Sequence, residues 1–203
     1  MNHSQPNPLP GIEELETRRL LAVTLAGSTL EIHLGGDDDV VVVRKKDTLL
    51  VVEFNAKKKK FDRETVKRLD IETRDGDDQI DLERAYERAY IDCGEDDDRV
   101  VGSNRDDSIS GAEGDDVIDG RDGNDTINGG SDRDSLYGDN GNDFIDGGDQ
   151  RDWIYGEAGD DDIDADDDAW EDNINGGPGN DHADIDDDLG IEDDAINVED
   201  TEE

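Results

Sequence analysis

The chain of 203 residues has few of the side chains that build an ordinary globular core: 31% are hydrophobic and 4% are aromatic. A thick hydrophobic core is therefore not expected. The single cysteine, Cys93, excludes an intramolecular disulfide. No hydrophobic run is long enough to cross a membrane as a helix. A fold with so thin a core and no disulfide needs another source of stability.

Basic side chains are scarce as well. The chain has 20 Lys and Arg against 61 Asp and Glu, which gives a formal net charge of -41. Composition alone predicts a disordered chain, because self-repulsion is strong and little apolar surface can be buried. The charge also excludes nucleic acids and anionic membrane surfaces as expected partners, since both require a basic footprint. Folding therefore calls for a positive charge that the sequence does not contain.

The acidic excess is confined to one part of the chain, and four regions are predicted. Residues 1–74 hold 13 acidic and 13 basic side chains, so the charge of -41 lies after them. Residues 1–19 are predicted to be a flexible leader, and residues 20–72 an N-terminal cap of short β-strands. Repeats are predicted at 73–184. Residues 185–203 are predicted to be an acidic tail or a frayed last coil, with a docking segment or secretion signal as the alternative.

Two motifs in the N-terminal part allow both a structural and a functional interpretation. The run "RRLLAVTLAG" from Arg18 has the composition of a signal peptide, but it starts late and alternates like a strand. A first β-strand is therefore favoured. The four lysines Lys57–Lys60 could bind a polyanion, but they stand between strand-like segments in a neutral region. A hairpin loop or a guarded sheet edge is favoured for them.

Aspartates recur every nine residues in the second half of the chain. Asp78 stands twenty residues before the regular series, and steps of eleven and nine residues after it lead to Asp172 and Asp181. Self-similarity at a fixed period predicts a solenoid. The members of the regular series are Asp98, Asp107, Asp116, Asp125, Asp134, Asp143, Asp152 and Asp161.

One repeat unit, residues 120–128, reads G-R-D-G-N-D-T-I-N. Its first six residues are predicted to form a turn in which glycine at the first and fourth places adopts a positive φ. Its last three residues are predicted to form a short strand whose middle side chain faces inward. Two units then make one coil, with strands on opposite sides. The predicted core row is Val100, Ile109, Ile118, Ile127, Leu136, Ile145, Ile154, Ile163 and Ile174.

The sixth-place aspartate ends each turn and is predicted to point along the rim, where turns on one edge stack about 4.8 Å apart. Unpaired carboxylates at that spacing would repel one another. Carboxylate and carbonyl oxygens of two stacked turns would form a cage of the kind that calcium prefers, with about six to eight hard oxygen ligands in flexible geometry. The repeats are therefore predicted to bind several Ca2+ ions, which supply the missing positive charge.

These residues resemble the hemolysin-type, or repeats-in-toxin, calcium-binding nonapeptide, whose consensus is G-G-x-G-x-D-x-U-x. The resemblance covers roughly residues 73–184 and implies calcium between the turns of a parallel β-roll. The predicted fold is thus all-β, a β-roll or β-helix solenoid with a β-rich N-terminal cap. The predicted metal-binding residues are Asp98, Asp107, Gly111, Gly114, Asp116, Gly120, Gly123, Asp125, Gly129, Asp134, Gly138, Gly141, Asp143, Gly147, Asp152, Gly156, Gly159, Asp161, Asp172 and Asp181.

The two edges of the predicted roll differ in quality. Turns on one edge are eighteen residues apart, and the edge that ends at Asp125, Asp143 and Asp161 has glycine at the fourth place. The other edge has Asp132 and Gln150 at that place, and glutamine fits a positive φ poorly. The tightest calcium sites are therefore predicted between the turns that end at Asp125, Asp143 and Asp161.

The sequence predicts a non-enzymatic calcium-binding module, because carboxylates this dense select no catalytic acid or base. A secreted or cell-surface location is expected, and residues 12–22 resemble a short element of exported proteins. One alternative is a surface adhesin or carbohydrate-contacting module that uses Tyr137, Trp153 and Tyr155, although paired tyrosines also simply stabilise a sheet. The other alternative is that the chain is a remnant of a larger exported repeats-in-toxin protein. A polysaccharide or protein partner stays open.

Overall fold

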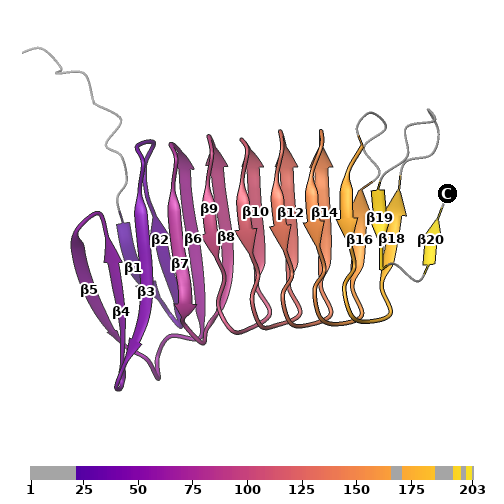
Figure 1. The fold of residues 1–203 in the computed structure, drawn as a ribbon. Coiled ribbons are helices and arrows are strands. Elements are labelled where there is room, and N and C mark those ends of the chain that lie inside the picture. The colour runs from indigo at the N-terminus through magenta and orange to yellow at the C-terminus, as the bar shows by residue number, and fades with distance from the viewer. Residues whose placement is uncertain (1–21, 166–170, 186–193, 198–199, 203) are drawn as a thin grey trace, which may run out of the picture.

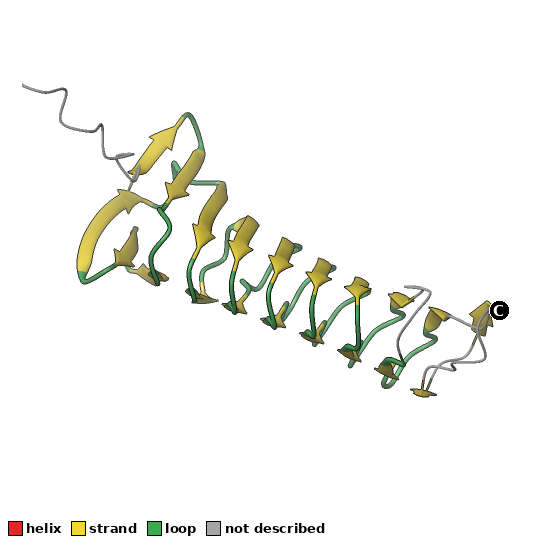
Figure 2. Ribbon diagram, turned by 90° about the horizontal axis from the view of Figure 1, so that it is seen from above, coloured by secondary structure: helices red, strands yellow, loops and turns green. Residues whose placement is uncertain are grey.

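Figure 1 shows the fold of the computed structural model, which describes residues 22–165, 171–185, 194–197 and 200–202. Two 10-stranded sheets face each other, and the chain crosses between them at each turn of the solenoid (Figure 2). The all-β parallel solenoid predicted from the repeat is confirmed. The described residues form no helix, and so none that is long and apolar enough to cross a membrane.

Sheet A contains every second strand of the roll, and its central strands pair in parallel. In order across the sheet, its strands are β1 (Ala22–Ala26), β2 (Thr29–His33), β6 (Arg68–Asp75), β8 (Arg88–Glu95), β10 (Ser108–Glu113), β12 (Thr126–Ser131), β14 (Phe144–Asp149), β16 (Asp162–Ala165), β18 (His182–Ile185) and β20 (Asp200–Glu202).

Sheet B contains the intervening strands, most of which are only three residues long. In order across the sheet, its strands are β19 (Asp194–Ile196), β17 (Asn173–Asn175), β15 (Trp153–Tyr155), β13 (Ser135–Tyr137), β11 (Val117–Asp119), β9 (Arg99–Val101), β7 (Gln79–Arg84), β3 (Val40–Lys46), β4 (Leu49–Phe54) and β5 (Lys57–Asp62).

The N-terminal strands extend the same two sheets. Strand β2 pairs in parallel with β6, and β3 pairs in parallel with β7, so the ladders of hydrogen bonds run from these strands into the repeats. The lysine run Lys57–Lys60 lies in β5, the outermost strand of sheet B, with its side chains exposed. It therefore guards an edge strand, where charged side chains discourage pairing with another chain. The predicted leader, residues 1–19, and most of residues 185–203 lie outside the described residues.

The core between the sheets is one side chain deep per strand, as predicted. Along sheet A, Ile109, Ile127 and Ile145 stand opposite one another in register, and each is at most 2% exposed. Along sheet B, Ile118 and Leu136 form the matching row and are fully buried. All nine residues of the predicted core row are at most 2% exposed.

The turns correct one prediction about glycine. First-place glycines such as Gly120 do not have a positive φ. The left-handed positions are the second and fourth: in the turn that ends at Asp125, Arg121 has a φ of 83° and Gly123 a φ of 145°. A Cβ on Gly120 would lie 2.6 Å from Oδ2 of Asp125, so the first-place glycine is needed for space and not for its φ.

The fourth place explains why the two edges tolerate different residues. On the edge that precedes sheet A, Gly123, Gly141 and Gly159 have φ values of 145°, 150° and 159°. On the other edge, Asp132 and Gln150 have φ values of 82° and 78°. Residues with a side chain can adopt a φ near 80° at a modest cost, and aspartate does so most readily. A φ near 150° is adopted almost only by glycine. The sequence difference therefore reflects two turn conformations.

Truncation of the core row should be costly because each strand contributes a single inward side chain. We expect Leu136→Ala to lower the free energy of unfolding by about 2–5 kcal/mol, as is usual for a buried leucine. Thr126→Ala, on the outer face of sheet A, should change it by less than about 0.5 kcal/mol. Urea unfolding of both variants in saturating calcium measures the difference, and equal effects would contradict a one-residue core.

Candidate metal centre

Two rows of buried aspartates run along the two edges of the roll, and each aspartate lies one residue before a strand. Ladder A precedes strands of sheet A and consists of Asp107, Asp125, Asp143, Asp161 and Asp181. Ladder B precedes strands of sheet B and consists of Asp39, Asp78, Asp98, Asp116, Asp134, Asp152 and Asp172.

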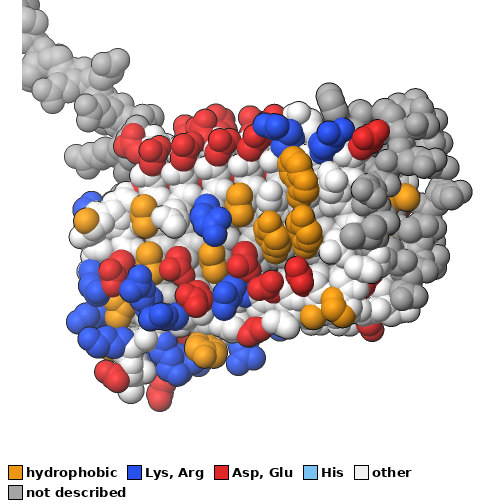
Figure 3. Space-filling view, viewed as in Figure 1, with side chains coloured by type: hydrophobic (Ala, Val, Ile, Leu, Met, Phe, Trp, Pro, Cys, Tyr) orange, Lys and Arg blue, Asp and Glu red, His pale blue; other side chains and the backbone are white. Residues whose placement is uncertain are grey.

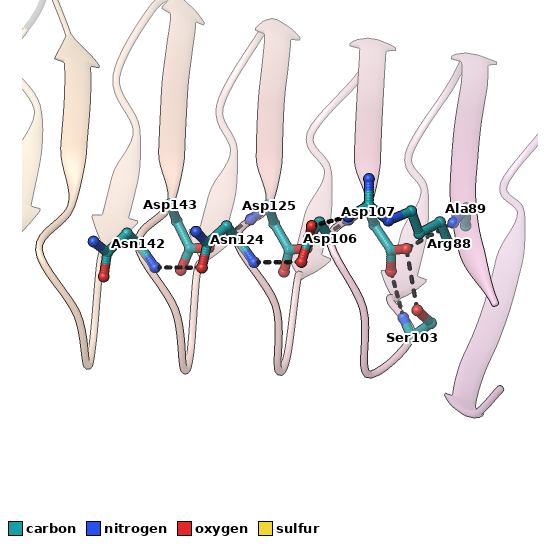
Figure 4. A network of polar contacts seen from close by, with 9 residues as sticks. All are labelled: Arg88, Ala89, Ser103, Asp106, Asp107, Asn124, Asp125, Asn142 and Asp143. Carbon is teal, nitrogen blue, oxygen red and sulfur yellow. Dashed lines mark hydrogen bonds and ion pairs between the residues drawn. The ribbon is translucent and has the colours of Figure 1, made fainter. Parts of the chain in front are cut away.

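Hydrogen bonds join each ladder from coil to coil (Figure 4). The backbone N–H of Asp107 donates to Oδ1 of Asp125 at 2.7 Å, and that of Asp125 donates to Oδ1 of Asp143 at 2.7 Å. The carboxylates are at most 4% exposed, so they lie inside the turns and do not point along the rim as predicted. The reason is that the inward position gives each carboxylate a buried backbone donor.

A second, outer row of hydrogen bonds runs in the opposite direction along the same edge. The backbone N–H of Asn124 donates back to Oδ1 of Asp106 at 3.3 Å, and that of Asn142 donates back to Oδ1 of Asn124 at 3.1 Å (Figure 4). The edge of ladder B has a similar but shorter outer row. The backbone N–H of Asp115 donates to Oδ1 of Asp97 at 3.0 Å, and that of Arg133 donates to Oδ1 of Asp115 at 3.1 Å. Arginine has no acceptor to offer the next coil. The outer row of ladder B therefore stops at Arg133, whereas that of ladder A continues.

The second oxygen of most ladder carboxylates has no hydrogen-bond partner among the described residues. A buried carboxylate oxygen without a donor is costly unless a cation compensates it. The oxygens concerned are Oδ2 of Asp39, Asp98, Asp116, Asp125, Asp134, Asp143, Asp161 and Asp181.

From Asp116 onward, the first-place glycine leaves room beside each of these oxygens. A Cβ on Gly138 would lie 2.4 Å from Oδ2 of Asp143 and 2.7 Å from the carbonyl oxygen of Gly156, one coil further on. A Cβ on Gly129 would lie 2.3 Å from Oδ2 of Asp134 and 2.5 Å from the carbonyl oxygen of Gly147. On both edges, a carboxylate oxygen and a carbonyl oxygen of the next turn thus face the same small space, which any side chain would fill.

The donor set fits calcium. Within the described part of the chain, no three His, Cys, Asp or Glu side chains gather around one point, so a bound ion would draw most of its ligands from backbone carbonyls. Such all-oxygen sites with flexible geometry suit calcium, whereas zinc and copper favour nitrogen or sulfur ligands. The ions that these cradles fit would be held by ladder carboxylates together with the carbonyls of first-place glycines.

Burial changes the acidity of the ladder carboxyls in the metal-free protein. It raises the pKa of Asp125 to about 8 and that of Asp134 to about 7. The backbone N–H bound to Oδ1 lowers the pKa in each case, and neighbouring ladder carboxylates raise it again. The pKa of Asp143 is raised to about 6 for the same leading reason. The fold therefore holds these groups in surroundings that disfavour their charged form.

The structure places the predicted residues on the two edges as follows. The glycines at the first place are Gly111, Gly120, Gly129, Gly138, Gly147 and Gly156, and those at the fourth place are Gly114, Gly123, Gly141 and Gly159. The ten predicted aspartates all occupy the sixth place and are all buried, at Asp98, Asp107, Asp116, Asp125, Asp134, Asp143, Asp152, Asp161, Asp172 and Asp181.

Sequence reasoning missed Asp39, the first member of ladder B. The backbone N–H of Asp39 donates to Oδ1 of Asp78 at 2.6 Å, and the side-chain amide of Asn55 donates to Oδ1 of Asp39. At later rungs the donor to Oδ1 is a backbone N–H, whereas at Asp39 it is the side-chain amide of Asn55. The signal was present, because Asp39 stands two residues before the core residue Val41. Strands β4 and β5 lie between Asp39 and the next coil and hide the period.

The first coils of ladder B lack the glycine cradle. Their first places are occupied by Leu34, Thr73 and Cys93, all at most 1% exposed. From Gly111 to Gly156 the place is always glycine on both edges, whereas Ala165 occupies it in the following turn of ladder B. The space that faces the ladder oxygen is therefore filled by a side chain in the N-terminal coils and left open in the later ones.

Comparison with protein-family models matches the RTX calcium-binding nonapeptide repeat in four copies, at residues 94–127, 101–136, 119–152 and 137–169. The chain carries RTX calcium-binding repeats. They form a parallel β-roll with stacked aspartate ladders, as the resemblance implied. RTX repeats are typical of secreted proteins. No curated protein and no solved structure matched the chain.

The aromatic strip that offered an alternative function lies on the outer face of sheet B of the RTX roll, below an acidic rim interrupted by arginines (Figure 3). The rings of Tyr137 and Tyr155 stack with centroids 5.0 Å apart and an interplanar angle of 4°. Each ring thus covers one face of the other. This packing accounts for the pair as a cross-strand contact that stabilises the sheet.

Metal-free protein should be more stable in acid than at neutral pH. The pKa of Asp125 rises to about 8 in the fold from an ordinary value near 3.8, so folding takes up protons between these values. Stability is therefore highest below about pH 4 and falls as the pH rises towards about 8. Circular dichroism in a chelator across this range measures it. If the metal-free roll gained stability with rising pH, the raised pKa values of the buried ladder carboxyls would be contradicted.

Proposed function

We propose that this chain is an extracellular calcium-binding module whose RTX roll folds when calcium binds, with a structural role and no catalysis. The observation that carries the proposal is the row of buried carboxylate oxygens without hydrogen-bond partners, which from Asp116 onward lie beside glycine cradles. The ions would supply the positive charge that the sequence, at -41, does not contain. Their binding would then be coupled directly to folding.

The core cannot sustain the fold against this charge. Each strand of the repeats buries a single aliphatic side chain, so little apolar burial offsets the backbone entropy of the turns. Burial of unpaired ladder carboxylates opposes folding further at neutral pH. In the cytosol, where calcium is scarce, the chain would stay expanded, and at millimolar calcium outside the cell it would fold. Affinities of about 10⁻⁴–10⁻³ M are typical of such extracellular modules.

Calcium sites should begin after the N-terminal coils. Thr73 and Cys93 fill the first places of the turns that end at Asp78 and Asp98, so these aspartates would serve mainly as hydrogen-bonded rungs. The open cradles begin with the turn of Gly111 on ladder B and are fully formed at Gly120 on ladder A. We therefore propose the predicted residues as calcium ligands and expect Asp98 to contribute least to calcium binding.

Ladder A should hold calcium more tightly than ladder B. Its outer row of hydrogen bonds continues through Asn124 and Asn142 to Asp160, whereas that of ladder B stops at Arg133. In its turns that end at Asp125, Asp143 and Asp161, the fourth-place residues are glycines with φ values near 150°, so their carbonyls stack without an intervening side chain. The turns of ladder A are thus joined by both an inner and an outer row of hydrogen bonds, which preorganises them better for an ion.

The first test is a calcium titration of the chelator-treated protein followed by far-ultraviolet circular dichroism. We expect β-structure to increase cooperatively, because each ion joins neighbouring turns. Magnesium serves as the control, since it demands a stricter octahedron and retains its waters. No gain of β-structure by about 10 mM calcium, well above the affinities expected for such sites, would refute calcium-dependent folding.

The second test compares single ladder residues by calcium affinity. Asp143→Ala should weaken binding more than Asp152→Ala, because the two residues lie on ladder A and ladder B. Asp78→Ala is the matched control from a coil whose cradle is filled by Thr73, and it should alter calcium affinity least. Isothermal titration calorimetry gives the three values. An equal loss in Asp143→Ala and Asp152→Ala would show that the edges are equivalent.

A further inference from the structure

A trough lies on the outer face of sheet A, on the opposite side of the roll from the tyrosine pair. It has a volume of about 510 Å³, within the range of small-molecule sites. Tyr90, Ser108 and Thr126 occupy the same register position on the neighbouring strands β8, β10 and β12. The residues of the trough that the argument uses are Arg68, Arg88, Tyr90, Asp106, Ser108 and Thr126.

An aromatic ring stands at each end of this row. Tyr90 is 50% exposed, and Phe144, which follows Thr126 in register on β14, is 41% exposed. The two small hydroxyl side chains between them form a low floor three strand steps long, about 14 Å. Unlike Tyr137 and Tyr155, these rings stand on strands too far apart to stack on each other. About half of Tyr90 and two fifths of Phe144 therefore face solvent.

Planar polar side chains line one side of the trough. Arg88 pairs with Asp106, and the backbone N–H of Asn124 donates to the same aspartate at 3.3 Å (Figure 4). These contacts hold the guanidinium and the carboxylate in place. Arg68 lies beside Arg88 in register and forms no ion pair among the described residues. Donors and acceptors are thus fixed along the floor of hydroxyl groups.

The charges of this surface favour a neutral ligand. The trough is lined by two arginines, Arg68 and Arg88, and by three aspartates, Asp70, Asp106 and the buried Asp107. Its lining therefore has no excess of positive charge, and the chain as a whole carries -41. An anionic polymer would be repelled by the rest of the molecule. Apolar ring faces beside alternating donors and acceptors suit a ligand that has both C–H faces and hydroxyl edges. A pyranose ring has this composition.

We propose that the trough on sheet A binds a neutral oligosaccharide, with Tyr90 and Phe144 as stacking platforms and Arg88, Asp106, Ser108 and Thr126 as hydrogen-bonding partners. The site needs the folded roll but no particular means of folding it. The outcome of a binding experiment on folded protein is therefore separate from the outcome of the calcium titration.

The test is calorimetric titration of the full chain, folded by circular dichroism, with cellohexaose, maltohexaose and xylohexaose. A hexamer of galacturonate provides the acidic comparison. At least one neutral hexasaccharide should bind with a Kd of about 1 mM or tighter. Tyr90→Ala should weaken that binding by up to about tenfold, the usual value of one aromatic stack.

Two further variants separate binding from folding. Thr126→Trp fills the floor on the outer face and should abolish binding while the circular dichroism stays unchanged. Trp153→Ala removes a 37% exposed aromatic residue from the opposite sheet and should leave binding as in the wild type. The proposal is overturned if no neutral hexasaccharide binds, if only the acidic one does, or if Thr126→Trp binds as the wild type does.

Discussion

Every coil of this roll depends on the hydrogen bond from a ladder N–H to Oδ1 of the aspartate one coil further on, at 2.6–3.0 Å along both edges. The bond fixes the carboxylate inside the turn, sets the stacking of successive turns and brings Oδ2 to the side of the first-place glycine. It also creates the electrostatic problem of the fold, because the same geometry buries a column of negative charge. A bound cation is the arrangement that resolves both consequences together.

The interior of the turns beside the ladder carboxylates changes along the length of the roll. At the N-terminal end, Asn55 closes ladder B, and side chains such as Thr73 and Cys93 fill the turn interiors. From Gly111 to Gly156, the interiors are open and the stability would pass from side-chain packing to metal binding. The N-terminal coils therefore have a conventional core, against which the glycine-rich coils of the RTX repeats pack. Nearest-neighbour coupling of this kind is general in solenoids.

The period was readable from the sequence because it is enforced in one dimension. A residue such as Ile127 contacts its equivalents one coil away in each direction, so each unit must satisfy the same requirements as the last. The core row, the two edges and the stacked tyrosines follow from that repetition. Asp39 escaped prediction because strands β4 and β5 interrupt the period, and its place in ladder B depends on pairing between β3 and β7. The role of the first-place glycine was misjudged because a sequence shows the residue but not which steric limit it meets.

The sequence by itself determined the all-β solenoid, the inward aliphatic row and the residue types of the RTX turns, since these repeat every nine residues. Only the tertiary structure decided where each carboxylate points, which turn interiors are open and which aromatic rings are covered. The physical reason is that these properties belong to pairs of coils eighteen or more residues apart. Gly138, Asp143 and Gly156 define a cradle only once two turns are stacked. Tyr90 and Thr126 share a trough only because β8, β10 and β12 are neighbours in register.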